Sequence, residues 1–212
     1  MDAEISTILL AAGESRRMGR PKLLLPWGNT TVLGKVIASF AEGFKSAVSP
    51  EAGSRKSNWE IVVITGGDRP QVENLLKELA KEYPVRAVYN PEYAHSGMIS
   101  SLKTGLQAIG PSVTAVLVGL GDQPQVRPET IREIRAAYIQ TRARLVVPSF
   151  QQRRGHPWLV ARSLWQEILE LPAPTTPRQF LQKHADETTY VSADETTLQD
   201  LDTPEEYNRS RP

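Results

Sequence analysis

The sequence contains no cysteine, and its three histidines (His95, His156 and His184) lie far apart. The absence of cysteine excludes a disulfide framework, a thiolate metal site and a cysteine nucleophile. The histidines lack the spacing of a zinc site, and we expect His95 and His184 to be structural. No apolar run reaches the roughly 18 residues that a membrane-spanning helix needs, so no membrane partner is expected.

An excess of charge of one sign is also missing. The 212 residues carry 25 basic and 24 acidic side chains, a formal net charge of +1. This balance provides no overall field for nucleic acid, and we expect no nucleic-acid partner. The length favours one domain with a compact core. The acidic start, Met1 to Glu4, is unlike a secretory signal, so we expect a soluble, cytoplasmic protein.

The most informative stretch runs from Ile8 to Lys22 and reads ILLAAGESRRMGRPK. Its apolar start is too short for an ordinary helix and predicts a buried strand. Gly13 and Gly19 allow tight turns and a close approach of backbone N–H groups to a ligand. The loop also contains four cationic side chains: Arg16, Arg17, Arg20 and Lys22. A strand that leads into a glycine-containing, cationic loop predicts a phosphate-binding site.

This loop follows neither of two common nucleotide-binding patterns, GxGxxG and GxxxxGK[ST]. Gly13 and Gly19 are one residue too far apart for the second pattern, and no lysine follows Gly19. The loop therefore indicates a nucleotide, but not these two ways of holding one. Taken alone, its arginines fit a solvated loop face equally well.

The first 150 residues alternate short apolar strands with amphipathic helices. We expect strands at 5–10, 61–65, 85–89, 115–120 and 145–148. Helices are expected at 32–40, capped by Thr30 or Thr31, and at 70–82, 97–109 and 128–141. Strands of this kind predict a mostly parallel sheet with helices on both faces. The expected fold is a single-domain, Rossmann-like α/β three-layer sandwich.

The alternation ends near Phe150. Residues 151–160 look like a hairpin or crossing loop that enters a strand, followed by helices at 163–171 and 177–184. A last strand is expected around 190–191. Thr203 is expected to cap a closing helix, with Pro204 at its first position.

Parallel sheets bind ligands beyond the carboxyl ends of their strands. The residues that follow the first four predicted strands are 11–22, Gly66–Gly67, Asn90 and Asp122. Nucleotidyl transfer depends on charge neutralisation and positioning. Gly13, Arg17 and Lys22 are candidates to hold a triphosphate. Asp122 and Asp202 offer two carboxylates, which together with water molecules suit Mg²⁺.

Several of these residues also have a structural interpretation. Gly-Asp before Gln-Pro is good turn chemistry, which alone favours Asp122 as a turn residue. Asp202 before Thr-Pro fits a helix start. Ser100 and Ser101 are by default ordinary polar residues, and His156 between Gly and Pro is more often structural. Co-occurrence at one sheet edge favours the functional interpretation for the cationic loop, Asp122 and Asp202.

Taken together, these motifs resemble the MobA-like nucleotidyltransferases, a Rossmann-like family of the nucleotide-diphospho-sugar transferase type. The resemblance covers nearly the whole chain. Five segments match in order: LAAGESRRMGRPK at 10–22, NP and GMISSL within 90–102, GDQP at 121–124, RGHP at 154–157 and DTPEEY at 202–207.

Within this family the segments look like the molybdenum cofactor cytidylyltransferase (MocA-like) branch. That branch carries LAAG and GDQP, whereas the guanylyl branch typically has LAGG in the first loop. Ala12 therefore argues for CTP over GTP. The implied reaction is Mg²⁺-dependent transfer of CMP from CTP to molybdopterin cofactor, which gives molybdopterin cytosine dinucleotide and pyrophosphate. A molybdenum hydroxylase that receives the product is an implied partner.

The resemblance also implies roles for individual residues. Arg17, Lys22 and Asp122 would be catalytic, with Arg17 and Lys22 on the β- and γ-phosphates. The remaining nucleotide contacts would come from Leu10, Ala11, Ala12, Gly13, Gly67, Asn90 and Ser101. Asp122 and Asp202 would hold Mg²⁺, and the pterin would face Arg154, Gly155 and His156. Residues 1–149 would form the nucleotide-binding half of the single domain 1–212, and residues 150–212 the acceptor half.

Three features depart from the family pattern. Segment 174–179 keeps only the arginine of a frequent Gly-Asp-x-Gly-Ala-Arg sequence, Leu201 stands where Ile or Val is usual, and the loop at 43–58 is long. Two other functions stay open. One is a nucleotidyltransferase that acts on a sugar phosphate or another phosphorylated acceptor. The other is a non-catalytic chaperone that binds the pterin cofactor, although Lys22 and Asp122 argue against it, because delivery needs no metal–triphosphate site.

Overall fold

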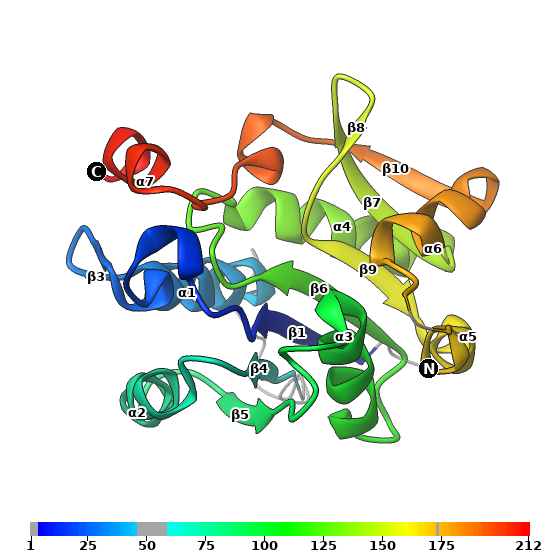
Figure 1. Ribbon diagram of the computed structural model, residues 1–212. Coiled ribbons are helices and arrows are strands. Elements are labelled where there is room, and N and C mark those ends of the chain that lie inside the picture. Colours follow the sequence, from blue (N-terminus) through cyan, green and yellow to red (C-terminus); the bar gives the residue numbers. More distant parts are fainter. Residues whose placement is uncertain (1–3, 46–58, 173) are drawn as a thin grey trace.

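The computed structural model of this protein describes residues 4–45, 59–172 and 174–212 (Figure 1). Its centre is a sheet of eight strands in the order β10-β7-β9-β6-β1-β4-β5, with β8 paired to β7. The strands are β1 (Ile5–Ala11), β4 (Ile61–Thr65), β5 (Val85–Tyr89), β6 (Ala115–Leu120), β7 (Leu145–Phe150), β8 (Arg153–Arg154), β9 (Trp158–Ala161) and β10 (Thr188–Ser192). A small separate hairpin joins β2 (Pro26–Trp27) to β3 (Thr30–Thr31).

The sheet is mostly parallel, as predicted. β6, β1, β4 and β5 are parallel neighbours, and β10 runs parallel to β7. β9 lies between β6 and β7 and is antiparallel to both, so β7 points the same way as β6. The side chains of Trp158, Leu159 and Val160 in β9 are fully buried, which explains how an antiparallel strand is accommodated in the middle of the sheet.

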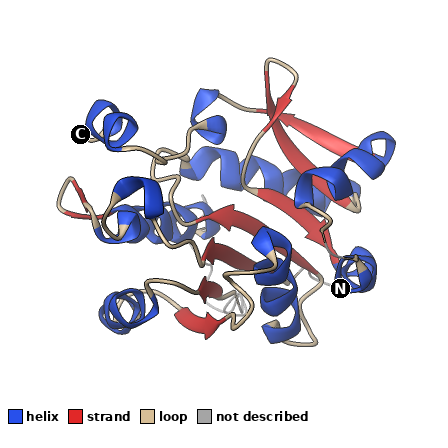
Figure 2. Ribbon diagram, viewed as in Figure 1, coloured by secondary structure: helices blue, strands red, loops and turns tan. Residues whose placement is uncertain are grey.

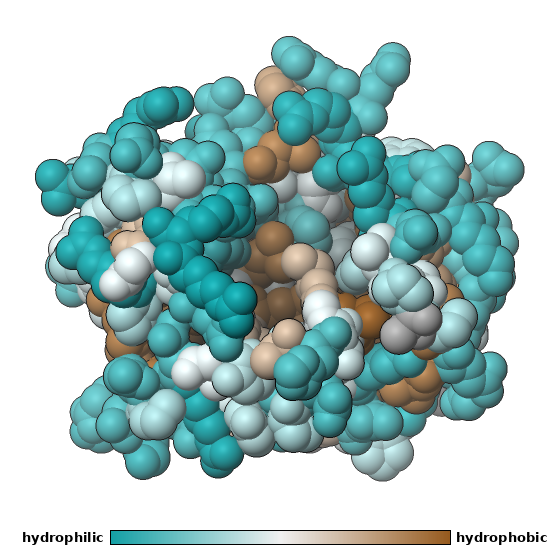
Figure 3. Space-filling model, in the orientation of Figure 1, coloured by the Kyte–Doolittle hydropathy of each residue, from teal (hydrophilic) through white to brown (hydrophobic). Residues whose placement is uncertain are grey.

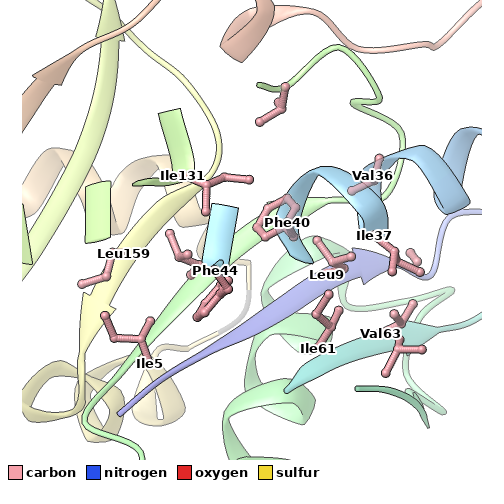
Figure 4. Packing of buried hydrophobic residues seen from close by; sticks show 14 of the residues in the cluster. Ile5, Leu9, Val36, Ile37, Phe40, Phe44, Ile61, Val63, Ile131 and Leu159 are labelled. Carbon is pink, nitrogen blue, oxygen red and sulfur yellow. The ribbon is translucent and has the colours of Figure 1, made fainter. Parts of the chain in front are cut away.

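Helices cover both faces of the sheet (Figure 2). They are α1 (Val32–Phe44), α2 (Arg69–Leu79), α3 (Gly97–Ala108), α4 (Pro128–Thr141), α5 (Trp165–Glu170), α6 (Pro177–Lys183) and α7 (Pro204–Ser210). Neighbouring strand residues point to opposite faces, so the sheet supplies two cores. Leu9 and Val63 pack with α1 and α4 on one face (Figure 4), and α2 contributes to the same cluster. Ile8 and Val62 pack with α3, α5 and α6 on the other. This arrangement confirms the single-domain three-layer sandwich.

A third, smaller apolar cluster ties the C-terminal helix α7 to the first loop. It contains Met18, Leu25, Trp27, Val32, Leu201 and Tyr207. The hydroxyl of Tyr207 also donates a hydrogen bond to the carbonyl of Pro26 over 2.6 Å. In Figure 1 this helix accordingly lies next to α1 and β3, although it is about 170 residues later in the sequence. The cluster brings Asp202 to the start of the chain.

The predicted elements are present, with shifted ends. The helix expected at 70–82 is α2, which stops at Leu79 because the next residues close into a turn in which Tyr83 N–H donates to the Leu79 carbonyl. The helix expected at 163–171 begins as a 3-10 turn at Arg162–Leu164. Most of the long 43–58 loop lies outside the described residues. No helix in the described ranges combines the length and apolar character needed to cross a membrane.

Candidate active site

The first loop has a defined shape that its own side chains impose. Ser15 and Gly19 adopt left-handed backbone conformations on either side of a 3-10 turn at Arg16–Met18. The Ser15 hydroxyl accepts a hydrogen bond from Lys22 N–H over 3.0 Å and contacts Asp68 over 3.2 Å. Met18 is buried in the cluster beneath α7. These contacts close the loop and bring the side chains of residues 17 and 22 to the carboxyl edge of the sheet.

Lys22 joins two carboxylates at that edge. Its ammonium group lies 2.5 Å from Asp122 Oδ2 and 2.9 Å from Asp202 Oδ1. Arg17 binds the second oxygen of Asp202 over 2.7 Å. The side chains of Lys22 and Asp122 are only 15% and 17% exposed, whereas Arg17 is 69% exposed. The structure thus brings together four residues that the sequence indicated from three distant segments.

The charges in this cluster shift the pKa values of Lys22 and Asp202 so that both side chains stay ionised. Burial on its own would lower the pKa of Lys22, but the charges and hydrogen bonds of Asp122 and Asp202 outweigh it, so the pKa is raised. Burial would likewise raise the pKa of Asp202, and the hydrogen bonds and charges of Lys22 and Arg17 lower it instead. Two cations and two anions therefore balance at the sheet edge.

Three further residues support this cluster and were not among the sequence-predicted site residues. Buried Gln123 donates from Nε2 to Asp200 Oδ1 over 2.7 Å. The pKa of Asp200 is raised by burial and, next, by the negative charge of Asp122. Glu206 accepts from the backbone N–H of Asp202 over 2.8 Å, which fixes the backbone from which that carboxylate projects. The Gln after Asp122 and the Asp-x-Asp pattern at 200–202 are signals that could have indicated the first two.

Asp202 precedes the start of helix α7, but its side chain does not cap that helix. Thr203 is the N-cap of α7 and forms a capping box with Glu206, and Pro204 occupies the first helical position, as predicted. The side chain of Asp202 takes no part in the cap and is directed to Lys22 and Arg17. The cap therefore positions Asp202 and leaves its carboxylate available to the site.

Gly66 and Gly67 support the first loop from the neighbouring strand. A Cβ atom on Gly66 would lie 2.3 Å from the carbonyl oxygen of Ala12, and one on Gly67 would lie 2.5 Å from Glu14 Cγ. The N–H of Gly67 donates to the same Ala12 oxygen over 3.3 Å. The close backbone approach therefore requires glycine here. The expected contact between Gly67 and a nucleotide stays a prediction, as do those of Leu10, Ala11 and Gly13.

Asn90 and Ser101 are brought together next to the start of α3. Asn90 donates from Nδ2 to the hydroxyls of Ser100 (2.9 Å) and Ser101 (3.0 Å), and its Oδ1 accepts from Glu92 N–H. Asn90 and Ser101 are both buried. This network fixes the loop between β5 and α3. Contacts of these two residues with a base or ribose stay a prediction.

A second feature is a cavity of about 1060 Å³. Figure 3 shows a hollowed face with apolar atoms in its depth and polar side chains around it. The cavity is bounded by the start of α3, the turn from β7 to β9, and α6, and its wall includes Arg153, Arg154, Gly155, His156, Arg178, Gln182 and Tyr190. No acidic residue contributes to it among the described residues, and the cluster around Lys22 does not line it. It is suited to an anion with an apolar body.

Gly155 and His156 attach the cavity wall to the segment that leads to Asp202. The N–H of His156 donates to the Thr197 carbonyl over 3.0 Å. A Cβ atom on Gly155 would lie 2.6 Å from the Thr197 Cβ and carbonyl oxygen. Burial lowers the pKa of His156 to about 4, so the ring is neutral at physiological pH. Gly155 therefore has a packing role in addition to its predicted place in the acceptor site.

The two carboxylates of the cluster fit a Mg²⁺ site. Asp122 and Asp202 both contact the Lys22 ammonium. The distance between their contacting oxygens therefore cannot exceed the sum of these two contact distances. Mg²⁺ is commonly bound through one or two carboxylates, phosphate oxygens and water. Among the described residues, no group of three or more His, Cys, Asp or Glu side chains is arranged to hold a metal. A site here would therefore need phosphate or water ligands.

Comparisons with known proteins identify the family and the fold. The family described as MobA-like NTP transferase domain matches residues 7–188. The chain is 27% identical over 203 residues to the molybdenum cofactor cytidylyltransferase of Escherichia coli (strain K12), which covers 96% of this chain and 93% of that protein. The crystal structure of Rv0371c from Mycobacterium tuberculosis H37Rv is 25% identical, with a TM-score of 0.76 over 99% of this chain and 97% of that one. A complex of Rv0371c with manganese shares the fold, with a TM-score of 0.72 at 24% identity over 99% of this chain and 98% of that one.

Proposed function

Since this chain belongs to the MobA-like NTP transferase domain family and is a nucleotidyltransferase, we propose that it transfers CMP from CTP to molybdopterin cofactor. The products are molybdopterin cytosine dinucleotide and pyrophosphate. The observation that carries nucleotidyl transfer is the contact of Lys22 with Asp122 and Asp202 at the carboxyl edge of the sheet. The similarity to the E. coli enzyme along nearly the whole chain supports CTP and the pterin acceptor.

The proposed reaction is an in-line displacement at phosphorus. An oxygen of the acceptor's terminal phosphate attacks the α-phosphorus of CTP, and the bond from that phosphorus to the α,β-bridging oxygen breaks. Pyrophosphate carries away the electron pair of the broken bond. The attacking phosphate is already ionised, so the chain does not have to supply a nucleophilic side chain. Its task is to hold two anions together and to stabilise the charge that develops on pyrophosphate.

The cationic residues of the first loop are suited to that task. On CTP binding, Lys22 and Arg17 would move from their carboxylate partners to the β- and γ-phosphates. Backbone N–H groups from Leu10 to Gly13 would contact the α-phosphate and the base. Asp122 and Asp202, released from the cations, would hold Mg²⁺, which when bound neutralises charge on the triphosphate. Gly67, Asn90 and Ser101 complete the nucleotide side.

The acceptor is assigned to the cavity bounded by the start of α3, the turn from β7 to β9, and α6. Its wall contains the guanidinium groups of Arg153, Arg154 and Arg178 and no carboxylate among the described residues. A phosphorylated heterocycle needs these features: positive charge for the phosphate and an apolar wall for the ring system. In this proposal residues 1–149 hold the nucleotide, and residues 150–212 form most of the acceptor cavity and contribute one metal ligand.

The test is a pyrophosphate-release assay with Mg²⁺, molybdopterin cofactor and either CTP or GTP. We expect more pyrophosphate release with CTP than with GTP, and no release when the acceptor is omitted. The absence of CTP turnover with this acceptor would contradict the proposal. Turnover with a sugar phosphate but not with the pterin would identify the acceptor as a sugar phosphate. Binding of the pterin without any turnover, unchanged by Asp122→Ala, would instead favour the cofactor-binding chaperone.

A further inference from the structure

Arg154 in the wall of the acceptor cavity is held by two side chains from other elements. Its Nε donates to the hydroxyl of Tyr190 over 2.9 Å, and its Nη1 donates to Gln182 Oε1 over 3.0 Å. Arg154 belongs to β8, Tyr190 to β10 and Gln182 lies in α6. The guanidinium carbon also lies 5.8 Å from the centre of the Tyr190 ring. All three side chains line the cavity.

The two hydrogen bonds leave three of the guanidinium donors unused. A guanidinium carries five N–H donors, and these contacts use one on Nε and one on Nη1. Within the described ranges no other acceptor contacts Arg154, so both donors of Nη2 and the second donor of Nη1 are available. Donors on adjacent nitrogens match the two oxygens of a phosphate or carboxylate in a bidentate contact.

The neighbouring arginine provides a comparison within the same turn. Arg153 lines the same cavity, but it is exposed, and its side chain forms no hydrogen bond or ion pair within the part of the chain that the structure describes. An unrestrained arginine loses its rotamer freedom only when a ligand binds, which weakens the contact. Arg154 has already lost that freedom in the free protein, so it can bind an anion more strongly than Arg153 with the same charge.

We propose that Tyr190 and Gln182 are positioning residues that hold Arg154 as a preformed fork for the phosphate of the acceptor. This inference rests on the proposed function, because that function makes the cavity the acceptor site. It assigns Tyr190 and Gln182 a part in acceptor affinity. It also predicts that the two adjacent arginines contribute unequally.

The experiment measures binding separately from turnover. Molybdopterin cofactor is titrated into the protein without CTP or metal, and quenching of tryptophan fluorescence is followed, since Trp158 lines the cavity. We expect Arg154→Ala to weaken binding about 10- to 100-fold, as for loss of a charge-assisted pair. Tyr190→Phe and Gln182→Met should each weaken it about three- to tenfold. Arg153→Ala should weaken it clearly less than Arg154→Ala, by about two- to threefold.

Two controls separate positioning from a general loss of structure. Tyr138→Phe also removes a tyrosine hydrogen bond, the one to the Thr114 carbonyl, but on α4 away from the cavity, and it should leave binding unchanged. In the Arg154→Ala background, Tyr190→Phe should have no further effect. The KM for CTP should stay the same in all these variants. Equal effects in both backgrounds, or a parallel rise in the KM for CTP, would overturn the inference.

A pterin without a phosphate group tests whether Arg154 binds the phosphate of the acceptor. It should bind the wild type and Arg154→Ala with equal, weak affinity. If it loses affinity in Arg154→Ala, or if the wild type does not bind the cofactor, the proposed fork is wrong. Wild-type binding without pyrophosphate release would contradict the proposed function alone. Pyrophosphate release with an acceptor KM unchanged by Tyr190→Phe would contradict this inference alone.

Discussion

The ammonium group of Lys22 lies 2.5 Å from Asp122 Oδ2, although the two residues are 100 positions apart in the sequence. Both follow parallel neighbouring strands, β1 and β6, so the topology of the sheet places them at one edge. The same ammonium contacts Asp202, which arrives from the far end of the chain. In this state the cations that would bind a triphosphate neutralise the carboxylates that would bind the metal.

Asp122→Asn tests the first carboxylate with little change in shape. We expect the CTP-dependent rate to fall about 100- to 1000-fold, as when one electrostatic group is removed from a transition-state site. Initial rates of pyrophosphate release at saturating Mg²⁺ measure the effect. Asp186→Asn removes an exposed carboxylate elsewhere and should leave the rate unchanged. A rate for Asp122→Asn within about threefold of the wild type would place the metal somewhere other than Asp122.

Lys22→Met tests the exchange of partners. The variant loses a phosphate ligand, so the KM for CTP should rise about 10-fold or more. It also frees Asp122 and Asp202 from the ammonium between them, so Mn²⁺ should bind more tightly in the absence of nucleotide. Calorimetric titration with Mn²⁺ measures this, with Lys35→Met, an exposed lysine on α1, as the matched variant. Weaker Mn²⁺ binding in Lys22→Met would show that the lysine does not compete with the metal.

Ala12→Gly tests the choice of nucleotide. The methyl group of Ala12 packs against Gly66 at the end of β1. Removing it should shift the ratio of kcat/KM for CTP over GTP toward GTP, on the order of tenfold for one methyl group. Thermal unfolding of the same variant reports any loss of stability separately. An unchanged ratio would mean that residue 12 does not set nucleotide preference.

Gly155→Ala tests the packing of the acceptor turn against Thr197. The added Cβ would lie 2.6 Å from Thr197 atoms that include backbone, so the turn must move. We expect a loss of about 1–3 kcal/mol in the free energy of unfolding, measured by urea denaturation. Gly110→Ala is the matched control, because its Cβ would meet no atom within 4 Å. If both variants were equally stable, the turn would be free to relax.

His156 predicts a pH dependence of stability. Burial lowers its pKa in the folded protein from 6.5 to about 4. Between these values the unfolded chain binds a proton that the folded chain does not, so the free energy of unfolding falls as the pH drops from 6.5 toward 4. The loss is at most about 3 kcal/mol and ends below the folded pKa. Urea denaturation at pH 6.5 and 5 measures it. His156→Asn should flatten this slope, whereas His95→Asn at an exposed histidine should keep it.

Much of the fold could be predicted because it depends on local patterns. Apolar runs gave β1, β4, β5 and β6, and the Thr-Pro signal gave the start of α7. The insertion of β9 between β6 and β7 was not predicted, because strand order depends on long-range packing of residues such as Trp158. For the same reason, the sequence did not reveal that Gly155 packs on Thr197.

The candidate site was predictable to the extent that its residues follow strands. Lys22 and Asp122 do so, and parallel topology brings such positions together. Gln123, Asp200 and Glu206 act through neighbours, and polar residues of this kind occur throughout any sequence. Tyr190 and Gln182 were missed for a similar reason: their contacts with Arg154 exist only once β10 and α6 are folded beside β8.

The contact between Lys22 and Asp202 spans 180 residues. During synthesis, β1 and the first loop leave the ribosome long before residue 202 is added. A growing chain therefore displays its cationic loop without the carboxylates that later balance it. Ligands that need the whole cluster cannot stabilise such an intermediate, because they bind only the finished arrangement. A ligand of the whole cluster could therefore stabilise this protein only after the segment that carries Asp202 has packed against the first loop.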